Sequence, residues 1–235
     1  MRRERQEKRV IVVGGGVGGL TAAIDLARQG ATVTLLERGP APGGKMRQLL
    51  VNGGHIDAGP TVMTMRWVFD ALFADAGARL DDRLTLKPLE VLARHHWNPG
   101  ERLDLFADLD RSADAIGAFA GAAEAKGFRA FATEARRIFT VLRAPFLESP
   151  RPNPISLTHR VGWTRIADML AIRPFESLWS ALSRHFKDPR LRQLFGRYAT
   201  YGGSSPFAAP ATLMLIAHVE QEGVWAIEGG MHALA

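Results

Sequence analysis

A glycine-rich turn near the N-terminus most constrains what this chain can fold into. Residues 9–20 read Arg-Val-Ile-Val-Val-Gly-Gly-Gly-Val-Gly-Gly-Leu. The apolar run 10–13 predicts a strand of a parallel sheet that is buried on both faces. Gly14, Gly16 and Gly19 occupy the positions of a G-x-G-x-x-G motif. Its first glycine allows a tight turn, its second lets a pyrophosphate approach the backbone, and its third lets helix and strand pack closely.

The residues after this turn favour a nucleotide-binding unit. Residues 20–29 predict a helix with one apolar face, and Gly30 is a natural helix terminator. Residues 31–36 predict a second strand, and Glu37 stands at its end. A carboxylate there accepts hydrogen bonds from the ribose hydroxyls of an adenosine and repels a 2′-phosphate, which argues against NADP. The expected apolar residues of the helix are Leu20, Ala23, Ile24 and Ala27.

We therefore predict that the turn and the start of the helix bind a dinucleotide, because the unpaired N–H groups and the dipole of a helix N-terminus attract phosphate. A glycine-rich loop in an ordinary α/β unit is the alternative. The predicted contact residues in this stretch are Gly14, Gly15, Gly16, Val17, Gly18 and Gly19.

Two further motifs follow in order. Glu37-Arg38 precedes Gly43-Gly44-Lys45, and Asp57-Ala58-Gly59-Pro60-Thr61 comes next. With the first motif, this order resembles the flavin-dependent amine oxidase and carotenoid desaturase superfamily. The resemblance implies a Rossmann-like α/β domain that binds FAD. It also implies that Arg38, Gly44 and Lys45 run along the pyrophosphate and ribityl chain of FAD. The residues that it implies approach the flavin are Gly59, Pro60 and Thr61.

The C-terminal part of the sequence narrows the resemblance. A glycine-rich turn at 201–207, an apolar helix, Gly223-Val224-Trp225 and the pair Gly229-Gly230 occur in the order found in carotenoid desaturases related to bacterial phytoene desaturase. The stretch 59–69 is most similar to the 1-hydroxycarotenoid 3,4-desaturases, also called methoxyneurosporene dehydrogenases. This implies desaturation of a C–C bond in a hydroxylated or methoxylated acyclic carotenoid, with hydride transfer to flavin and proton loss from the neighbouring carbon.

Members of that family run to about twice this length, and their C-terminal part completes the flavin site. We therefore expect the 235 residues to be the N-terminal part of a longer protein or a truncated reading frame. Should they be the whole polypeptide, we expect weak or no retention of FAD and poor stability, because the strands would lose their sheet neighbours.

The pattern of elements predicts four parts. The expected parts are a basic tail at 1–9, an FAD-binding and flavin-contacting part at 10–88, an inserted, mostly helical substrate domain at 89–222, and the start of a return to the FAD domain at 223–235. The expected elements are a helix at 64–76, strands at 84–88, 89–96 and 102–106, helical spacing from 108 to about 146, a linker or extended arm at 145–154, and helices at 161–186, 189–198 and 210–222. The expected core residues of the first long helical run are Phe119, Phe128, Phe131, Ile138 and Phe139.

Composition bounds the chemistry. The chain has no cysteine, so it uses neither disulfide nor thiolate, and redox chemistry must come from a cofactor. Residues 151–197 hold nine basic and three acidic side chains among Trp, Leu and Phe. This mixture suits an anionic membrane surface, although a solvated helix face explains it equally well. We expect a cytoplasmic protein, peripheral on the inner face of the cytoplasmic or photosynthetic membrane and without nucleic-acid binding. The sequence does not indicate an oligomeric state.

The sequence names no catalytic acid or base. None of the seven histidines has a spacing suited to a metal or a triad. His95 and His96 point to opposite faces of a predicted strand, so they make a poor metal pair. His232, beside the Gly229-Gly230 pair, is either a neighbour of the flavin or an ordinary turn residue.

Three alternatives stay open. A flavin amine oxidase of the same fold would oxidise C–N bonds. A non-catalytic lipid carrier, such as the prenyl-protein escort and dissociation-inhibitor proteins, lacks the intact phosphate-binding pattern present here. A simple NAD dehydrogenase fits the first 37 residues but not the two later motifs.

Overall fold

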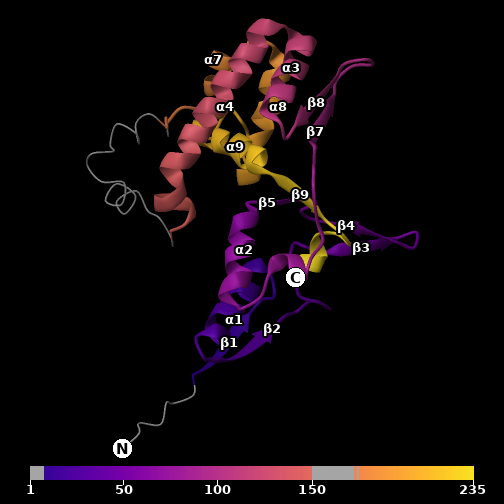
Figure 1. The fold of residues 1–235 in the computed structure, drawn as a ribbon, viewed down its shortest axis with the longest axis vertical. Helices are drawn as coiled ribbons and strands as arrows, with labels where there is room; N and C mark the ends of the chain where they lie inside the picture. The colour runs from indigo at the N-terminus through magenta and orange to yellow at the C-terminus, as the bar shows by residue number, and fades with distance from the viewer. Residues whose placement is uncertain (1–7, 150–171, 174) are drawn as a thin grey trace, which may run out of the picture. The chain divides into compact units, whose positions relative to one another are not determined.

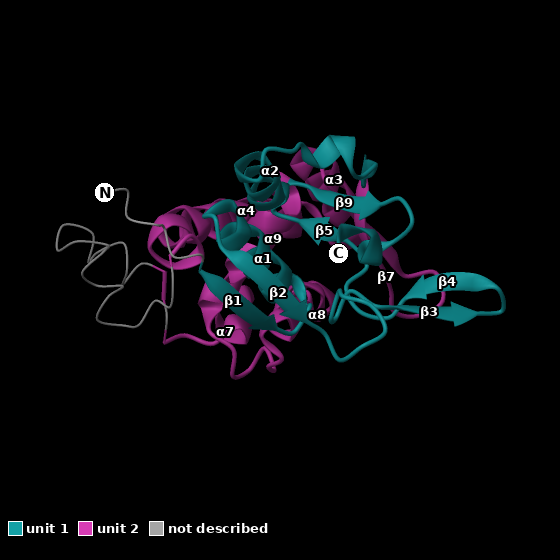
Figure 2. Ribbon diagram, turned by 90° about the horizontal axis from the view of Figure 1, so that it is seen from below, with its two compact units in different colours: residues 1–89, 223–235 teal, residues 90–222 magenta. Residues whose placement is uncertain are grey.

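The chain forms two compact units. The computed structural model describes residues 8–149, 172–173 and 175–235. Unit 1 consists of residues 1–89 and 223–235, and unit 2 consists of residues 90–222 (Figure 2). The chain therefore leaves unit 1 once and returns to it for its last 13 residues.

Unit 1 begins with a parallel strand–helix–strand unit. Strand β1 (Arg9–Val13), helix α1 (Val17–Arg28) and strand β2 (Thr32–Leu36) follow one another along the chain. The two strands pair in parallel, with Val13 opposite Leu36. Gly30 follows the end of α1 with φ of +87°, which suits a helix terminator without a side chain. The predicted strand, helix and second strand are confirmed.

The expectation that the first strand is buried on both faces is wrong for the described residues. Ile11 is 66% exposed and Val13 is 82% exposed, while Val10 and Val12 are half-buried. The cause is that β1 pairs only with β2 and that α1 covers only one face of this pair. On α1, Leu20 and Ala23 are half-buried, but Ile24 and Ala27 are exposed, against expectation.

The rest of unit 1 joins segments from both ends of the chain. Strand β9, from the C-terminal segment, lies between β5 and β6 in an antiparallel three-stranded sheet. Strands β3 and β4 form a separate hairpin that projects from the unit (Figure 1). The buried core is Met46, Met63, Leu80, Ile227 and Met231. The elements are β3 (Gln48–Val51), β4 (Gly54–Asp57), β5 (Met63–Thr64), α2 (Arg66–Asp75), η1 (Leu80–Asp82), β6 (Leu86–Pro88), β9 (Val224–Ile227) and η6 (Met231–Leu234).

Unit 2 is mostly helical and has one hairpin. Strands β7 and β8 pair antiparallel as predicted. Acidic residues begin two of its helices: Asp108 accepts a hydrogen bond from Arg111 N–H, and Asp188 accepts one from Arg190 N–H. The elements are β7 (Val91–His96), β8 (Arg102–Phe106), α3 (Leu109–Ala120), α4 (Ala122–Leu142), the π-helix η2 (Arg143–Leu147), α7 (Leu178–His185), α8 (Pro189–Gly196), η4 (Arg197–Gly202), η5 (Ala211–Met214) and α9 (Leu215–Glu222).

The first helical run of unit 2 differs from expectation in two ways. The chain breaks it at Gly121, whose φ of +100° separates α3 from α4. Phe119, near that break, is only half-buried. The other expected core residues are buried, as predicted: Phe128, Phe131, Ile138 and Phe139.

The helix predicted at 161–186 is only partly testable. Residues 172, 173 and 175–177 are not helical, and α7 begins at Leu178, so the prediction of helix is wrong for these described residues. The apolar residues expected on the earlier part, Trp163, Ile166, Met169 and Leu170, lie outside the described residues.

A glycine in the second turn of α4 sets how closely two helices of unit 2 approach. A Cβ atom on Gly127 would lie 2.0 Å from the carbonyl oxygen of His185, at the end of α7. We expect Gly127→Ala to lower the free energy of unfolding by about 1–3 kcal/mol, because the helices must separate. The measurement is urea denaturation of the complete gene product.

The matched control is Gly117→Ala in α3. Its added Cβ would meet the Ala125 side chain at 3.4 Å, an ordinary contact. Alanine is the better helix former, so this variant should be neutral or more stable by up to about 1 kcal/mol. Equal effects of the two substitutions would contradict the packing described here.

Candidate dinucleotide-binding site

The turn after β1 is built on backbone contacts. Gly14 has φ of +101°, and its N–H donates to the carbonyl of Leu36, at 2.7 Å, so the turn is tied to the end of β2. A Cβ on Gly19 would lie 1.9 Å from the carbonyl oxygen of Gly14. The first and third glycines of the motif therefore do what the pattern predicts, a tight turn and close packing of helix on strand.

Helix α1 starts in a way that leaves its first N–H groups available to an anion. Gly16 is the N-cap residue and offers no side-chain hydrogen bond, and the first turn has no acidic residue. Val17 and Gly18 are exposed. An uncapped helix start combines free N–H donors with the positive end of the helix dipole, which is the arrangement that attracts phosphate.

A second glycine pair packs directly on the first turn. The Gly43 N–H donates to the carbonyl of Gly15, at 2.7 Å, and Gly43 forms a β-bridge with Gly16. Gly44 has φ of +58°, and a Cβ on it would lie 2.9 Å from the Cα of Gly16. The first two motifs of the sequence are thus in backbone contact, with no room for a side chain between them.

Glu37 lies at the junction of these segments. Its Oε2 accepts a hydrogen bond from Gly15 N–H at 2.6 Å, and its Oε1 accepts one from Gly39 N–H at 2.7 Å. The hydrogen bonds from Gly39 and Gly15 hold the pKa of the Glu37 carboxyl below its ordinary value. A carboxylate has about four lone-pair positions, so about two remain for hydroxyl donors of a ligand.

Two cavities meet at Gly44. The larger, of about 620 Å³, contains the predicted residues Glu37, Arg38 and Gly44. Eight further residues line this cavity, and of these the sequence had suggested only His232, as one of two interpretations. They are Gly39, Pro40, Ala41, Pro42, Arg47, Gln48, His55 and His232.

The smaller cavity, of about 380 Å³, brings together the predicted residues Gly44, Lys45, Gly59 and Pro60. A Cβ on Gly59 would lie 1.8 Å from the carbonyl oxygen of Lys45, so the third motif packs on the second as closely as the second packs on the first. Thr61 is exposed and lines neither cavity. Val17 and Gly18 line a different groove of about 520 Å³, shared with Leu72 of α2.

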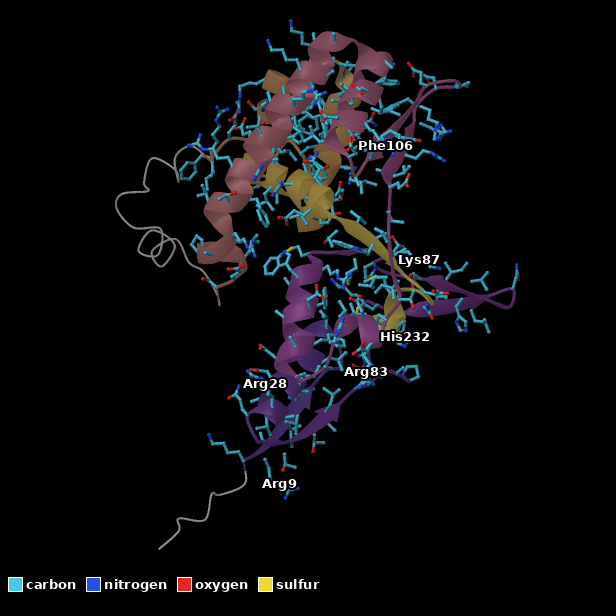
Figure 3. The ribbon with its side chains drawn as sticks, viewed as in Figure 1. Arg9, Arg28, Arg83, Lys87, Phe106 and His232 are labelled. Carbon is cyan, nitrogen blue, oxygen red and sulfur yellow. The ribbon has the colours of Figure 1, made fainter. Side chains whose placement is uncertain are left out.

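The C-terminal segment closes the larger cavity. Asp57 accepts hydrogen bonds from the Met231 N–H at 3.0 and 3.1 Å, and Gln48 Nε2 donates to the Gly229 carbonyl at 2.7 Å. His232 directly follows Met231 and lines the cavity; it is labelled in Figure 3. Among the described residues, no group of His, Asp or Glu side chains is arranged to hold a metal ion.

The glycines of the first motif permit a direct test of this geometry. We expect Gly19→Ala to lower the melting temperature of the complete gene product by about 4 °C or more, because its Cβ would overlap the Gly14 carbonyl and displace the turn. In the matched variant Gly18→Ala, the Cβ meets no atom within 4 Å and alanine is the better helix former, so the melting temperature should be unchanged or higher. A similar loss in both variants would refute the close contact.

The sequence comparisons agree with the resemblance inferred from the motifs. Residues 12–75 match the family model of the NAD(P)-binding Rossmann-like domain. The chain is 56% identical to hydroxyneurosporene desaturase of Rubrivivax gelatinosus over 97% of its own length and 43% of that protein. It is 48% identical to the hydroxyneurosporene desaturase of Rhodobacter capsulatus, covering 98% of this chain and 47% of that one. The chain spans about half the length of these curated relatives.

Solved structures share the fold at low sequence identity. A putrescine oxidase bound to putrescine has a TM-score of 0.55 and 16% identity, over 97% of this chain and 47% of that one. A Rab GDI from Plasmodium falciparum has a TM-score of 0.52 and 10% identity, over 97% of this chain and 55% of that one. Residues 12–75 thus match a Rossmann-like dinucleotide-binding domain model, and the chain as a whole is similar to about half of the hydroxyneurosporene desaturases.

Proposed function

We propose that the complete gene product is an FAD-dependent desaturase of acyclic carotenoids that carry a hydroxyl or methoxyl group, acting in carotenoid biosynthesis. The observation that carries this proposal is the 56% identity to a hydroxyneurosporene desaturase along 97% of the chain. Because the chain spans about half of that relative, the activity and substrate of the whole protein are inferred from similarity.

The cofactor proposal rests on how the residues of unit 1 fit FAD. The start of α1 would hold the phosphates, and Glu37 would accept the adenosine ribose hydroxyls with its remaining lone pairs. Arg38, Gly44 and Lys45 would follow the pyrophosphate and ribityl chain. The two cavities that meet at Gly44 together favour a ligand longer than the adenosine half of a dinucleotide. The residues proposed to approach the flavin are Gly59, Pro60 and Thr61.

The proposed desaturation requires mainly that the protein position the substrate against the flavin. A bound flavin supplies the acceptor for a hydride from one carbon, and a proton leaves the neighbouring carbon. A polyene has no carbonyl to polarise, so the chain's residues act by binding, orienting and excluding water. We assign no acid or base among the described residues.

Unit 2 is proposed as the substrate domain, and delivery of the substrate from a membrane surface stays a prediction. A polyene dissolved in lipid is already out of water, so moving it into a protein gains little of the roughly 0.8 kcal/mol per methylene available on leaving water. Of the arginines expected to meet the membrane, Arg160 and Arg165 lie outside the described residues, while Arg173 pairs with Glu134 and Glu176. No helix within the described ranges is both long and apolar enough to cross a bilayer.

The alternatives differ in what supports them. The fold is shared by an amine-oxidising enzyme and by a GDI, so the fold alone does not choose among the proposals. Sequence identity favours the desaturase, because the similarity to desaturases is 48–56% while that to the putrescine oxidase is 16%. A simple NAD dehydrogenase would not need the second and third motifs.

Pigment conversion tests the proposed reaction. We expect the complete gene, expressed in a host that accumulates an acyclic 1-hydroxycarotenoid, to yield a product lighter by two hydrogens with absorption at longer wavelength. The measurement is chromatography with mass spectrometry of the extracted pigments. Unchanged pigment alongside soluble, flavin-loaded protein would refute the reaction, and turnover of an amine with no change in pigment would favour the oxidase.

Glu37 tests the proposed cofactor. We expect Glu37→Ala to weaken FAD binding by about 10- to 100-fold, because hydrogen bonds to a charged group contribute about 1.5–3 kcal/mol. The measurement is titration of the cofactor-free complete protein with FAD, followed by flavin fluorescence. Asp25→Asn on α1 is the control, since Asp25 forms an exposed pair with Arg28 and should leave affinity unchanged. Equal affinities of Glu37→Ala and wild type would contradict the ribose contact.

A further inference from the structure

One imidazole lies between the second glycine pair and the larger cavity. The Nδ1 atom of His232 is 2.8 Å from the carbonyl oxygen of Met46. A carbonyl only accepts hydrogen bonds, so Nδ1 carries the hydrogen and donates it. A Cβ on Gly43 would lie 3.0 Å from the same nitrogen, so the ring rests directly against the glycine pair.

The other ring nitrogen is the informative one. In a neutral imidazole with its hydrogen on Nδ1, Nε2 is an acceptor. Nε2 of His232 makes no hydrogen bond to any described residue, and it is not among the buried unpaired atoms. The ring lines the cavity of about 620 Å³ together with Glu37, Arg38 and Gly44. An acceptor is therefore presented to the space proposed for the dinucleotide.

The position of this ring is fixed from its own element as well. Asp57 accepts hydrogen bonds from the Met231 N–H, at the start of η6. Gly230 has φ of +88°, and a Cβ on it would lie 2.3 Å from Gln48 Nε2, so the turn before η6 sits against β3. A side chain held through both its ring and its backbone is oriented before any ligand arrives, which favours binding.

We propose that His232 is a dinucleotide-contacting residue whose Nε2 accepts a hydrogen bond from a sugar hydroxyl of FAD, on the adenosine ribose or on the ribityl chain. A neutral Nε2 cannot donate to phosphate, and the donors of FAD are its sugar hydroxyls, the adenine amino group and the flavin N3–H. The hydroxyls are chosen because the same cavity holds Glu37 and Arg38, the residues proposed to contact the ribose and the pyrophosphate–ribityl part. Arg38 and Arg47, which line the same cavity, are the donors suited to phosphate. This inference rests on the proposed function, that FAD occupies this cavity.

Three substitutions of His232 distinguish the contact made by Nδ1 from the contact proposed for Nε2. In His232→Asn, the side-chain amide can donate to the Met46 carbonyl but has nothing at the place of Nε2. In His232→Gln, the longer amide brings an oxygen toward the place of Nε2. His232→Ala removes both contacts.

Titration of the cofactor-free complete protein with FAD gives the main readout, and its melting temperature without FAD gives the second. We expect His232→Asn to melt like wild type and to bind FAD about 5- to 10-fold more weakly, the effect of one lost neutral hydrogen bond. His232→Ala should lose affinity and also melt lower. His232→Gln should bind FAD more tightly than His232→Ala.

A parallel titration with ADP identifies the hydroxyl. Loss of ADP affinity in His232→Asn points to the adenosine ribose, and loss confined to FAD points to the ribityl chain, and either result supports the contact. The control is His96→Asn, an exposed histidine on β7 of unit 2, which should leave both affinities unchanged. If His232→Asn binds FAD as tightly as wild type, His232 only holds the turn and the inference falls, while the proposed function stands. If wild type binds no FAD, both fall.

Discussion

The site depends on two backbone segments, 14–16 and 43–44, that lie closer together than any side chain would permit. Their contact is a hydrogen bond from Gly43 N–H to the Gly15 carbonyl and a Gly44–Gly16 approach with no space for a Cβ. The pairing of β1 with β2 and the hydrogen bond from Gly14 N–H to the Leu36 carbonyl place Glu37 beside the same turn, where its carboxylate accepts the Gly15 N–H. Glycine is needed here for the distance between backbones as much as for the positive φ values.

Such a contact buries almost no apolar surface, so unit 1 must gain its stability elsewhere. The strands of the parallel pair contribute none of the buried core residues, and Ile11 and Val13 are largely exposed. The core comes instead from Met46, Met63 and Leu80 together with residues of the returning segment. Core residues also adjoin the candidate site: the backbone carbonyl of Met46 binds His232, and Met231 precedes that histidine in the chain.

What the sequence predicted well was local. The strand–turn–helix–strand of residues 9–36, the hairpin of β7 and β8, and the helix starts at Asp108 and Asp188 each have their signal within a few residues. The Asn52-Gly53 turn carried an equally local signal for the hairpin of β3 and β4, with φ of +48° and +80°, and this hairpin was not predicted. Gly121 likewise marked the break between α3 and α4.

What could not be read from the sequence was non-local. Whether an apolar strand is buried depends on which elements pack on it. The apolar run 10–13 indicates only that packing on both faces of the strand would be favourable. The cavity residues Gln48 and His232 approach each other across almost the whole chain, since Gln48 binds Gly229 over a separation of 181 residues. No pattern within a short window contains that information, so His232 was left between two interpretations.

The return of the chain to unit 1 also bears on when the site can form. Unit 2 is one continuous stretch, whereas unit 1 requires residues 223–235 to meet residues that precede them by more than 130 positions. Closing so long a loop costs entropy before any contact compensates, and β9 and η6 supply the compensation through the three-stranded sheet and the Asp57 contact. A ligand that touches both His232 and the first glycine turn would stabilise this closed arrangement by mass action, since it binds only where both segments are in place. If the proposed dinucleotide binds there, its binding and the closure of unit 1 would therefore be coupled through the same few backbone contacts.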